Sequence, residues 1–412
     1  MRILMACAAF PPFIDGGGPI SALLLARMLQ DEGHDVRVLN AGDHDADEMI
    51  EGVPVRRIAA PNVYWNYRVP RPTWKKLVWH GLENGNPRAF SAMRREIRAF
   101  APDILLTDSI ENINVATWAA ARSLGVPVAH TIRSAFLLCW RGVMQRQGVN
   151  CDGQCLTCWT SALGKRFFSR FVDGVCGESD DVISRHVERG YFPNALVRRI
   201  PGAIERIVAE GPRAAPRDRP LRIGFIGVHT RFKGLDVFGR AAARLVETLP
   251  EASVAFHVAG TGNAEDEARL TADFPRDHTR FWGWVDPQDF FPEIDLLVFP
   301  SVGHEAFGRV AVEAFAHAVP VVGSDLGGIA ETVRDGVNGL LFPAADDAAL
   351  ADRLTRVARD PDLYDTLSRG AHAAAHAYLR PTIAGLYTQF LQDTMTHHHA
   401  RPITTDEREV AL

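Results

Sequence analysis

Short apolar runs alternate with helical patterns twice along this chain, and that alternation restricts its fold more than any other feature. Near-continuous apolar strands separated by helices are typical of a parallel sheet covered on both faces. The first series of runs stands at Ile3–Ala6, Val36–Leu39, Ile104–Thr107, Val126–Ala129 and Val172–Cys176, and the second at Leu221–Gly227, Val254–Ala259, Leu296–Phe299, Val319–Val322 and Leu340–Phe342. The sequence therefore predicts the α/β class, with two doubly wound parallel-sheet (Rossmann-like) domains facing across a cleft.

The length of the chain also favours two domains, because 412 residues are too many for one ordinary core. Residues 205–220 are rich in Pro and Arg and show no strand period, which is typical of a linker. We predict a first domain at 1–200, a linker at 201–220, a second domain at 221–378, a final helix at 379–394 and a frayed tail at 395–412.

Composition and charge exclude several classes of protein. An apolar content of 47% and a charged content of 23% are normal for a soluble globular chain, and the net charge of -5 gives no support to nucleic-acid binding. The first apolar stretch is too short for a signal peptide or a membrane span, which predicts a cytoplasmic protein. Peripheral contact with the inner face of a membrane is left open, since Trp65, Tyr67, Trp74 and Trp79 stand near the Lys75–Lys76 pair. Scattered core aromatics are the alternative.

Two carboxylates eight residues apart, Glu305 and Glu313, stand between two of the apolar runs. If Phe307 opens a helix, Glu305 lies at its edge and Glu313 about two turns inside, roughly 12 Å away. The first backbone N–H groups, from Phe307 to Arg309, would then be free, and the helix dipole would favour an anion there. Such an element could hold a phosphate at its tip and a pair of hydroxyls at each carboxylate, which predicts a nucleotide-sugar site.

Glycine-rich loops follow several of the predicted strands. Gly16 and Gly17 lie between the first strand and the first helix, where they allow backbone to approach a ligand, although a G-x-G-x-x-G fingerprint is absent. After the first strand of the second domain, Arg231 and Lys233 offer positive charge, and Lys233 can meet a diphosphate. Gly260 follows the next strand and could border a base or a phosphate. A tight turn or a solvated loop charge is the alternative at each position.

Four cysteines lie close together as Cys139-x11-Cys151-x3-Cys155-x2-Cys158. Four thiols match the ligand count of a structural zinc site, and an iron–sulfur cluster would need the same four thiolates. The spacing is not that of a standard zinc finger. Disulfides are uncommon in cytoplasmic chains, so we do not expect these cysteines to be paired in disulfide bonds. The alternatives to a metal site are reduced, partly buried cysteines and redox regulation through the cluster.

Taken together, the motifs resemble those of the family-4 glycosyltransferases with the GT-B fold, from Met1 to about Gln392. The ordered series consists of Pro-Pro-x3-Gly-Gly near the start, Gly33-His34-x-Val36, Lys233-Gly234, Gly260-x-Gly262, Glu305-x7-Glu313 with Phe307-Gly308, and Gly327-Gly328-x2-Glu331. The resemblance implies a sugar donor activated by UDP or GDP, and transfer with retention of the anomeric configuration. The acceptor would be a hydroxyl of a glycan, a lipid-linked glycan or a small molecule.

The resemblance also implies roles for single residues. Glu305 would meet hydroxyls of the transferred sugar, and Glu313 would hold the ribose hydroxyls. Lys233 and the amides of Phe307 and Gly308 would stabilise the diphosphate, which Gly16 and Gly17 would border from the first domain. No catalytic metal would be needed. The cysteine cluster resembles one found in part of the family, which implies a structural metal. The final helix would cross back to the first domain, as it does in the family.

Three positions depart from the family pattern, and the mildest departure is Ala306 in place of a common Gly. Val228 stands where an Arg is usual, so His229, Arg231 or Arg309 would have to supply that charge. Arg133 stands where a first-domain His is usual, and His130 lies three residues upstream. We keep both Arg133 and His130 as candidate catalytic residues.

The two carboxylates of a retaining hydrolase lie about 5 Å apart. Glu305 and Glu313 would be too far apart for that role. We therefore expect front-face substitution, in which the departing phosphate helps to deprotonate the acceptor. A nucleotide-sugar epimerase on the same fold and a catalytically silent nucleotide-sugar-binding protein are the alternatives.

Overall fold

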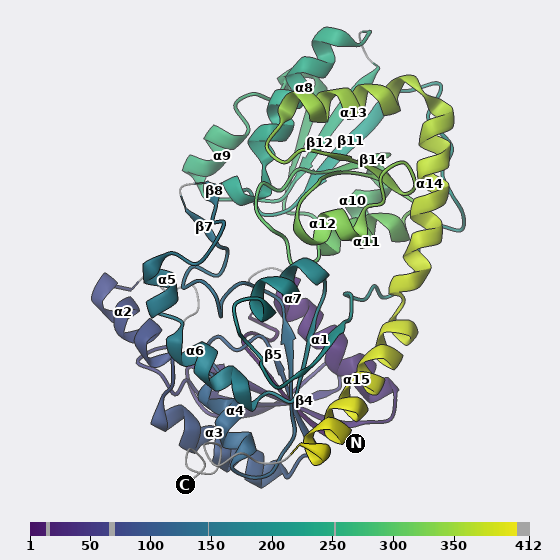
Figure 1. Cartoon of the computed structure of the whole chain (residues 1–412). Coiled ribbons are helices and arrows are strands. Elements are labelled where there is room, and N and C mark those ends of the chain that lie inside the picture. Colours follow the sequence, from purple (N-terminus) through teal and green to yellow (C-terminus); the bar gives the residue numbers. More distant parts are fainter. Residues whose placement is uncertain (14–16, 66–70, 147, 251–252, 402–412) are drawn as a thin grey trace. The chain divides into compact units, whose positions relative to one another are not determined.

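The computed structural model describes residues 1–13, 17–65, 71–146, 148–250 and 253–401. These residues form two compact units (Figure 1). The first unit contains Met1–Met144, Cys151–Pro201 and the chain from Pro381 onward, and the second contains Gln145–Asn150 and Gly202–Arg380. Each unit is a parallel-sheet α/β domain, so the predicted fold class is confirmed.

The first unit is built on an eight-stranded sheet in the order β10-β9-β6-β5-β1-β2-β4-β3. Neighbouring strands are parallel except for β3, which is antiparallel to β4. The strands are β1 (Arg2–Cys7), β2 (Asp35–Gly42), β3 (Ala46–Ile50), β4 (Val53–Ala59), β5 (Ile104–Asp108), β6 (Val128–Ile132), β9 (Gly174–Gly177) and β10 (Leu196–Arg199). The helices are α1 (Gly17–Asp31), α2 (Thr73–Leu82), α3 (Pro87–Phe100), α4 (Ala116–Arg122), α5 (Leu156–Thr160), α6 (Leu163–Phe168), α7 (Asp180–Val187) and α15 (Arg380–Ala400), with a short 3-10 helix η1 (Ser169–Phe171).

The second unit is built on a six-stranded parallel sheet in the order β13-β12-β11-β14-β15-β16. Its strands are β11 (Leu221–Ile226), β12 (Val254–Ala259), β13 (Thr279–Gly283), β14 (Leu296–Phe299), β15 (Val321–Ser324) and β16 (Gly339–Phe342), and β7 (Gln145–Arg146) pairs with β8 (Val149–Asn150) in a small hairpin. Its helices are α8 (Leu235–Thr248), α9 (Ala264–Leu270), α10 (Pro287–Phe290), α11 (Arg309–Ala316), α12 (Gly327–Thr332), α13 (Asp347–Arg359) and α14 (Pro361–Ala375), with 3-10 helices η2 (Arg231–Lys233), η3 (Arg276–His278), η4 (Phe291–Glu293) and η5 (His376–Tyr378).

Two apolar clusters in the second unit explain why its strands read as continuous apolar runs. One contains Phe238 and Leu354 from helices α8 and α13, and the other contains Phe315 and Ile329 from α11 and α12. Because both clusters include strand residues, both faces of the sheet are covered by helices.

The final helix, α15, packs onto the first unit and runs beyond the predicted end at 394 to Ala400. The prediction of a frayed tail is therefore wrong for residues 395–400, and residues 402–412 lie outside the described part of the chain. A Cβ atom on Gly174 of β9 would lie 2.1 Å from Thr394 Oγ1, so the helix touches the backbone of the sheet. Further along, His398 Nδ1 lies 2.9 Å from Asp173 Oδ2. This contact ties down the last turns of the helix.

The sheet order fixes where a ligand can bind in the second unit. From β11 the chain continues to β12 on one side, and it later returns to β14 on the other side. The loops after β11 and β14 therefore open beside each other at the carboxyl edge of the sheet, at a topological switch point, where α/β folds bind their ligands. Among the described residues, no helix combines the length and the hydropathy that crossing a membrane requires.

Candidate functional site

The two loops at the switch point bring Lys233 and Glu305 together. Lys233 ends the 3-10 helix η2 after β11, and Glu305 lies in the loop after β14. Lys233 Nζ donates a hydrogen bond to Glu305 Oε1 at 2.7 Å, and the hydroxyl of Ser301 donates to the same oxygen at 2.7 Å. The Lys233 and Glu305 side chains are 30% and 14% exposed. An ammonium and a carboxylate thus lie fixed at the sheet edge, still reachable from solvent.

Close backbone contacts hold these two loops in place. Gly234 has a φ of 67°, and a Cβ atom there would lie 1.9 Å from the carbonyl oxygen of Pro300, so only glycine lets the two loops approach. On the other side, the N–H of Gly328 donates to the carbonyl of Glu305 at 2.9 Å. Ser324, which ends β15, donates its hydroxyl to the carbonyl of Ser301 at 2.7 Å. The backbone of the loop after β14 is therefore fixed by the turn before α8, by the end of β15 and by the start of α12.

The helix after this loop begins later than the sequence pattern predicts. Helix α11 starts at Arg309, because Gly308 takes a left-handed conformation with a φ of 87° at its N-cap. Phe307 is only 3% exposed and packs into the core, with its ring 5.8 Å from that of Tyr378. The prediction that Phe307 opens the helix is therefore wrong. Glu313 consequently lies about one turn inside the helix instead of two.

Arg309 and Glu313 form an ion pair along α11, with Nε and Oε1 2.6 Å apart. Their side chains are 27% and 21% exposed. The first amides of α11 have no intrahelical acceptor, and the helix dipole makes this end positive. The loop that carries Glu305 leads directly into this helix end, so the segment places two carboxylates beside a helix N-terminus, which favours an anion. Binding of a nucleotide sugar at this segment stays a prediction.

Val228 stands where an Arg is usual, and the structure distinguishes between the neighbouring side chains that could supply the missing positive charge. Val228 is 52% exposed and carries no charge. His229 is buried and lies against Glu267, with Nδ1 and Oε1 3.2 Å apart, and burial lowers the pKa of His229. This placement favours a role in packing. Arg231, by contrast, is exposed in the same turn as Lys233, where its guanidinium borders Gly148.

Gly260 has a structural reason to be glycine. Its φ is 115°, and a Cβ atom would lie 1.8 Å from the carbonyl oxygen of Gly227. Its N–H donates to Gly283 at 2.7 Å. The loops after β11 and β12 can therefore pack closely only without a side chain here. Its predicted place beside a donor stays a prediction.

In the first unit, Arg133 joins three neighbouring strands at their carboxyl ends. Its Nε donates to Asp108, the last residue of β5, and its Nη1 donates to Glu178, just after β9, at 2.6 Å. Burial opposes the charge of Arg133, but the two carboxylates outweigh burial and raise its pKa well above the ordinary value. Arg133 is therefore held and neutralised by two acids.

His130, by contrast, lies inside the sheet. It is 2% exposed, its Nδ1 is hydrogen-bonded to Thr107 Oγ1 at 2.8 Å, and its ring lies 5.1 Å from Trp118 and 5.5 Å from Phe192. Burial lowers its pKa to about 3. This placement favours a packing role, and we correct the catalytic role that the sequence suggested. Gly17, which begins α1, is exposed at the carboxyl end of β1, while Gly16 lies outside the described residues.

The four clustered cysteines lie near one another, because Cys158 contacts both Cys139 and Cys155, and Cys151 lies close enough to Cys139 and Cys155 to feel their charge. Cys139 Sγ and Cys158 Sγ lie 3.5 Å apart, and Cys155 Sγ is 3.2 Å from Thr157 Oγ1. The described cysteines, Cys151 included, are all free thiols. In the part of the chain that the structure describes, no three His, Cys, Asp or Glu side chains are grouped as a metal ion would require. The thiols as they stand do not form a closed four-ligand site, so zinc or an iron–sulfur cluster stays a prediction.

Three residues at these edges were not singled out from the sequence: Ser301, Asp108 and Glu178. Asp108 follows the apolar run Ile104–Thr107, and Glu178 follows Val172–Cys176 at a distance of two residues. Polar side chains at the carboxyl ends of parallel strands meet at one edge of the sheet. That rule, applied to every predicted strand, could have found them.

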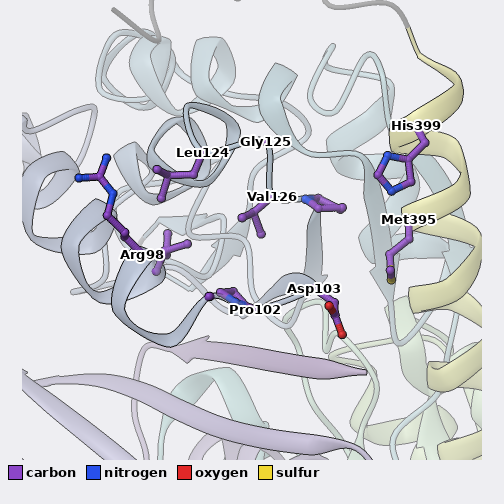
Figure 2. A pocket seen from close by; sticks show the side chains of 11 residues that line it. Arg98, Pro102, Asp103, Leu124, Gly125, Val126, Met395 and His399 are labelled. Atoms are coloured by element: carbon purple, nitrogen blue, oxygen red, sulfur yellow. The ribbon is translucent and has the colours of Figure 1, made fainter.

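A pocket of about 470 Å³ lies at the opposite edge of the first sheet (Figure 2). Pro102 and Asp103 precede β5, Gly125 and Val126 precede β6, and His399 comes from α15. Because these residues lie at the amino ends of the strands, where α/β folds do not bind their ligands, we assign the pocket no part in the site.

Comparison with known proteins gives a consistent result. The family model described as "Glycosyl transferase 4-like domain" matches residues 16–203, and the one described as "Glycosyl transferases group 1" matches residues 220–360. A relative from Klebsiella pneumoniae, named as an uncharacterized 42.6 kDa protein in the cps region, is 28% identical over 81% of this chain and 88% of its own length.

Two solved structures share the fold. Sucrose-phosphate synthase from Thermosynechococcus elongatus superposes with a TM-score of 0.74 at 20% identity, covering 96% of this chain and 100% of the other. Anabaena Alr3699/HepE in complex with UDP-glucose superposes with a TM-score of 0.68 at 18% identity, covering 95% of this chain and 100% of the other. With both halves matched by glycosyltransferase models and the GT-B fold shared along nearly its whole length, the chain belongs to the family-4 glycosyltransferases.

Proposed function

We propose that this chain moves a sugar from a nucleotide-sugar donor to an acceptor hydroxyl with retention of the anomeric configuration and without a catalytic metal. The observation that carries the proposal is the Lys233–Glu305 pair at the switch point of the second sheet, in the loop that leads into α11. Few ligands other than a phosphorylated polyol need a cation, a helix N-terminus and a carboxylate at one place.

The positive groups support a diphosphate donor. Lys233, the first amides of α11 and the exposed Arg231 supply charge and hydrogen-bond donors for a UDP- or GDP-sugar. The Anabaena neighbour, which shares the fold of this chain, was solved with UDP-glucose. This likeness in fold favours UDP over GDP as the nucleotide of the donor. On donor binding, Lys233 would share its charge between Glu305 and the diphosphate. Glu305 would then accept hydrogen bonds from sugar hydroxyls.

The same contacts support substitution without a covalent sugar–enzyme intermediate. One oxygen of Glu305 already accepts hydrogen bonds from Lys233 and Ser301, which makes this carboxylate a weak nucleophile. As the glycosidic bond to the diphosphate breaks, negative charge grows on the leaving phosphate oxygen. Lys233 and the start of α11 would stabilise that charge, and the phosphate would take the proton of the acceptor hydroxyl.

The first experiment is a thermal-shift screen of the full chain against UDP- and GDP-sugars. A true donor should stabilise the protein by about 2.7 kcal/mol at 100 times its dissociation constant. The best donor then goes into a transfer assay, and NMR of the product reports the anomeric configuration. Sugar release that requires an acceptor supports transfer, and an inverted product contradicts retention.

Two other outcomes favour the alternatives. Conversion of the donor sugar without any acceptor would indicate an epimerase. Tight donor binding without turnover, under all acceptors tried, would indicate a silent nucleotide-sugar-binding protein, for which Val228 in place of the usual Arg is the sequence observation.

A further inference from the structure

Helix α2 in the first unit presents an apolar face to solvent. Trp74, Leu77 and Val78 recur at the spacing of one helix face and are 63%, 68% and 43% exposed. Trp79 is buried on the other side of the helix, at 2% exposure. The predicted aromatic surface therefore includes Trp74 but not Trp79, and Tyr67 lies outside the described residues. Trp65 packs its ring 4.7 Å from Phe13.

A second group of exposed apolar side chains lies on α5 and α6. Leu156, Trp159, Leu163 and Phe167 recur every three or four residues and are 76%, 46%, 47% and 39% exposed. A soluble surface normally exposes such side chains singly. Here two neighbouring short helices carry a row of them.

The two groups belong to one surface, because α2 and the α5–α6 segment are packed together (Figure 1). Asn84, just after α2, accepts from the N–H of Gly164 at 3.0 Å and donates to the carbonyl of Ser161 at 2.7 Å. The ring of His80 on α2 lies 5.6 Å from that of Trp140, which is itself 38% exposed. We call this surface the apolar–basic face; it comprises Trp74–Val78, Trp140–Arg141, the exposed residues of 156–167 and the part-buried Arg170.

The charge on the apolar–basic face is opposite to that of the whole chain. Its cations are Lys75, Lys76, Arg141, Arg166 and Arg170, whereas residues 71–82 contain no acid, residues 139–171 contain only Asp152, and the chain has a net charge of -5. Three of these cations lie over exposed aromatic rings, Lys75 over Trp74 at 5.5 Å, Arg141 over Trp140 at 4.7 Å and Arg170 over Phe167 at 4.3 Å. Within the described residues, none of the five lies at ion-pair distance from a carboxylate.

We propose that the apolar–basic face docks on an anionic lipid bilayer. Large apolar side chains flanked by Lys and Arg suit the boundary between acyl chains and negative head groups, where the aromatic bodies are buried and the cations stay at the phosphates. Aromatic residues and Arg are also common at protein interfaces, but Lys is depleted there, so the Lys75–Lys76 pair favours the bilayer over a protein partner. The inference is independent of the transfer reaction, and failure of either leaves the other standing.

The test is flotation of the full chain with vesicles of phosphatidylcholine alone or mixed with phosphatidylglycerol. Binding should require phosphatidylglycerol and should weaken as salt is raised, because surface attraction is screened. The double variant Trp74→Ser/Leu77→Ser should reduce partitioning by at least roughly tenfold. The double variant Lys75→Ser/Lys76→Ser should reduce it on anionic vesicles.

Trp284→Ser is the matched control, because Trp284 is 79% exposed but lies in the second unit. It should leave partitioning unchanged. All the altered side chains except the part-buried Lys75 are exposed, so folding is checked by an unchanged circular dichroism spectrum. The proposal is overturned if the chain does not float with anionic vesicles, or if the Trp74/Leu77 variant floats like the parent. It is also overturned if the face instead mediates a dimer in solution that this variant abolishes.

Discussion

At the scale of single residues, the hydrogen bond between Lys233 and Glu305 fixes the position of both side chains before a ligand binds. Lys233→Ala should lower kcat by roughly 10²-fold, because a cation that stabilises the leaving diphosphate is lost. Steady-state kinetics with the donor found by thermal shift would measure the kcat of this variant and of the parent. Arg244→Ala removes the ion pair between the exposed Arg244 of α8 and Asp347 of α13; it is the control and should leave kcat unchanged.

Glu313→Ala should act differently, raising the KM for the donor by about tenfold or more as charged hydrogen bonds to the ribose are lost. The change also releases Arg309 from its ion pair. Arg309→Ala therefore serves as the companion variant, because it removes the cation and leaves Glu313 in place. If the KM of the Glu313 variant equals that of the parent, the ribose role of this carboxylate is wrong.

His130 makes stability depend on pH. Its pKa is lowered to about 3 in the folded protein, so below about 6.5 only the unfolded state takes up the proton. Stability is therefore lost as pH falls from about 6.5 toward 3, by about 2 kcal/mol between pH 7 and pH 5. His130→Phe should remove this part of the acid sensitivity, since Thr107 keeps its bonds to Ala129 and Trp118.

Urea titrations at pH 7 and pH 5 would measure the difference in the free energy of unfolding for both proteins. His376→Gln, at an exposed histidine, is the control and should leave the pH dependence as it is. An equal loss of stability in the parent and the His130 variant would contradict the assignment.

At the scale of elements, two helical glycines should respond to alanine with opposite sign. A Cβ atom on Gly370 of α14 would lie 1.9 Å from the carbonyl oxygen of Val337, whereas Gly385 of α15 has nothing within 4 Å. Gly385→Ala should stabilise by about 0.5–1 kcal/mol through helix propensity. Gly370→Ala should destabilise by about 1–3 kcal/mol through crowding. Thermal unfolding of the two variants, side by side, is the measurement, and a shared sign would refute the argument.

Elements with long apolar runs were predictable, and irregular ones were not. β1, β2, β5, β11, β12 and β14 coincide with the apolar runs because they are buried on both faces. β3 and β10, at the edges of the first sheet, have mostly exposed or part-exposed residues and lack such runs, as does β13. The start of α11 was missed because Gly308 takes a positive φ and Phe307 turns into the core, neither of which periodicity reveals.

The same limit applies to the site. Lys233 and Glu305 could be named because motifs follow strands that are adjacent at the switch point. The ion pairs that neutralise Arg133 could not be predicted, because Asp108 and Glu178 are separated from Arg133 by 25 and 45 positions in the sequence. Only the strand order β9-β6-β5 brings the three together.

At the scale of the whole molecule, the first unit needs a segment that the chain supplies only after the second unit. Ile383, Tyr387, Phe390 and Leu391 of α15 are each at most 3% exposed. At about 1.5–3 kcal/mol per buried side chain, their loss would rival the 5–15 kcal/mol that keeps a domain folded. A chain cut after Arg380 should therefore lose the folded first unit and keep the second.

Calorimetry should show one unfolding transition fewer in the shortened chain, and the remaining one should still shift when the donor is added. Leu386→Ser, at a position that is 44% exposed on the same helix, should leave both transitions in place. Retention of both transitions after the cut would show that α15 is dispensable.

A ribosome delivers this chain in order, so β1 to β10 have left it well before α15 exists. The segment from Gly202 to Arg380 can complete its own sheet in that interval, although it is made second. Meanwhile the backbone of β9 at Gly174, where Thr394 will sit, stays uncovered. Newly made copies therefore most need a chaperone in the interval before α15 leaves the ribosome.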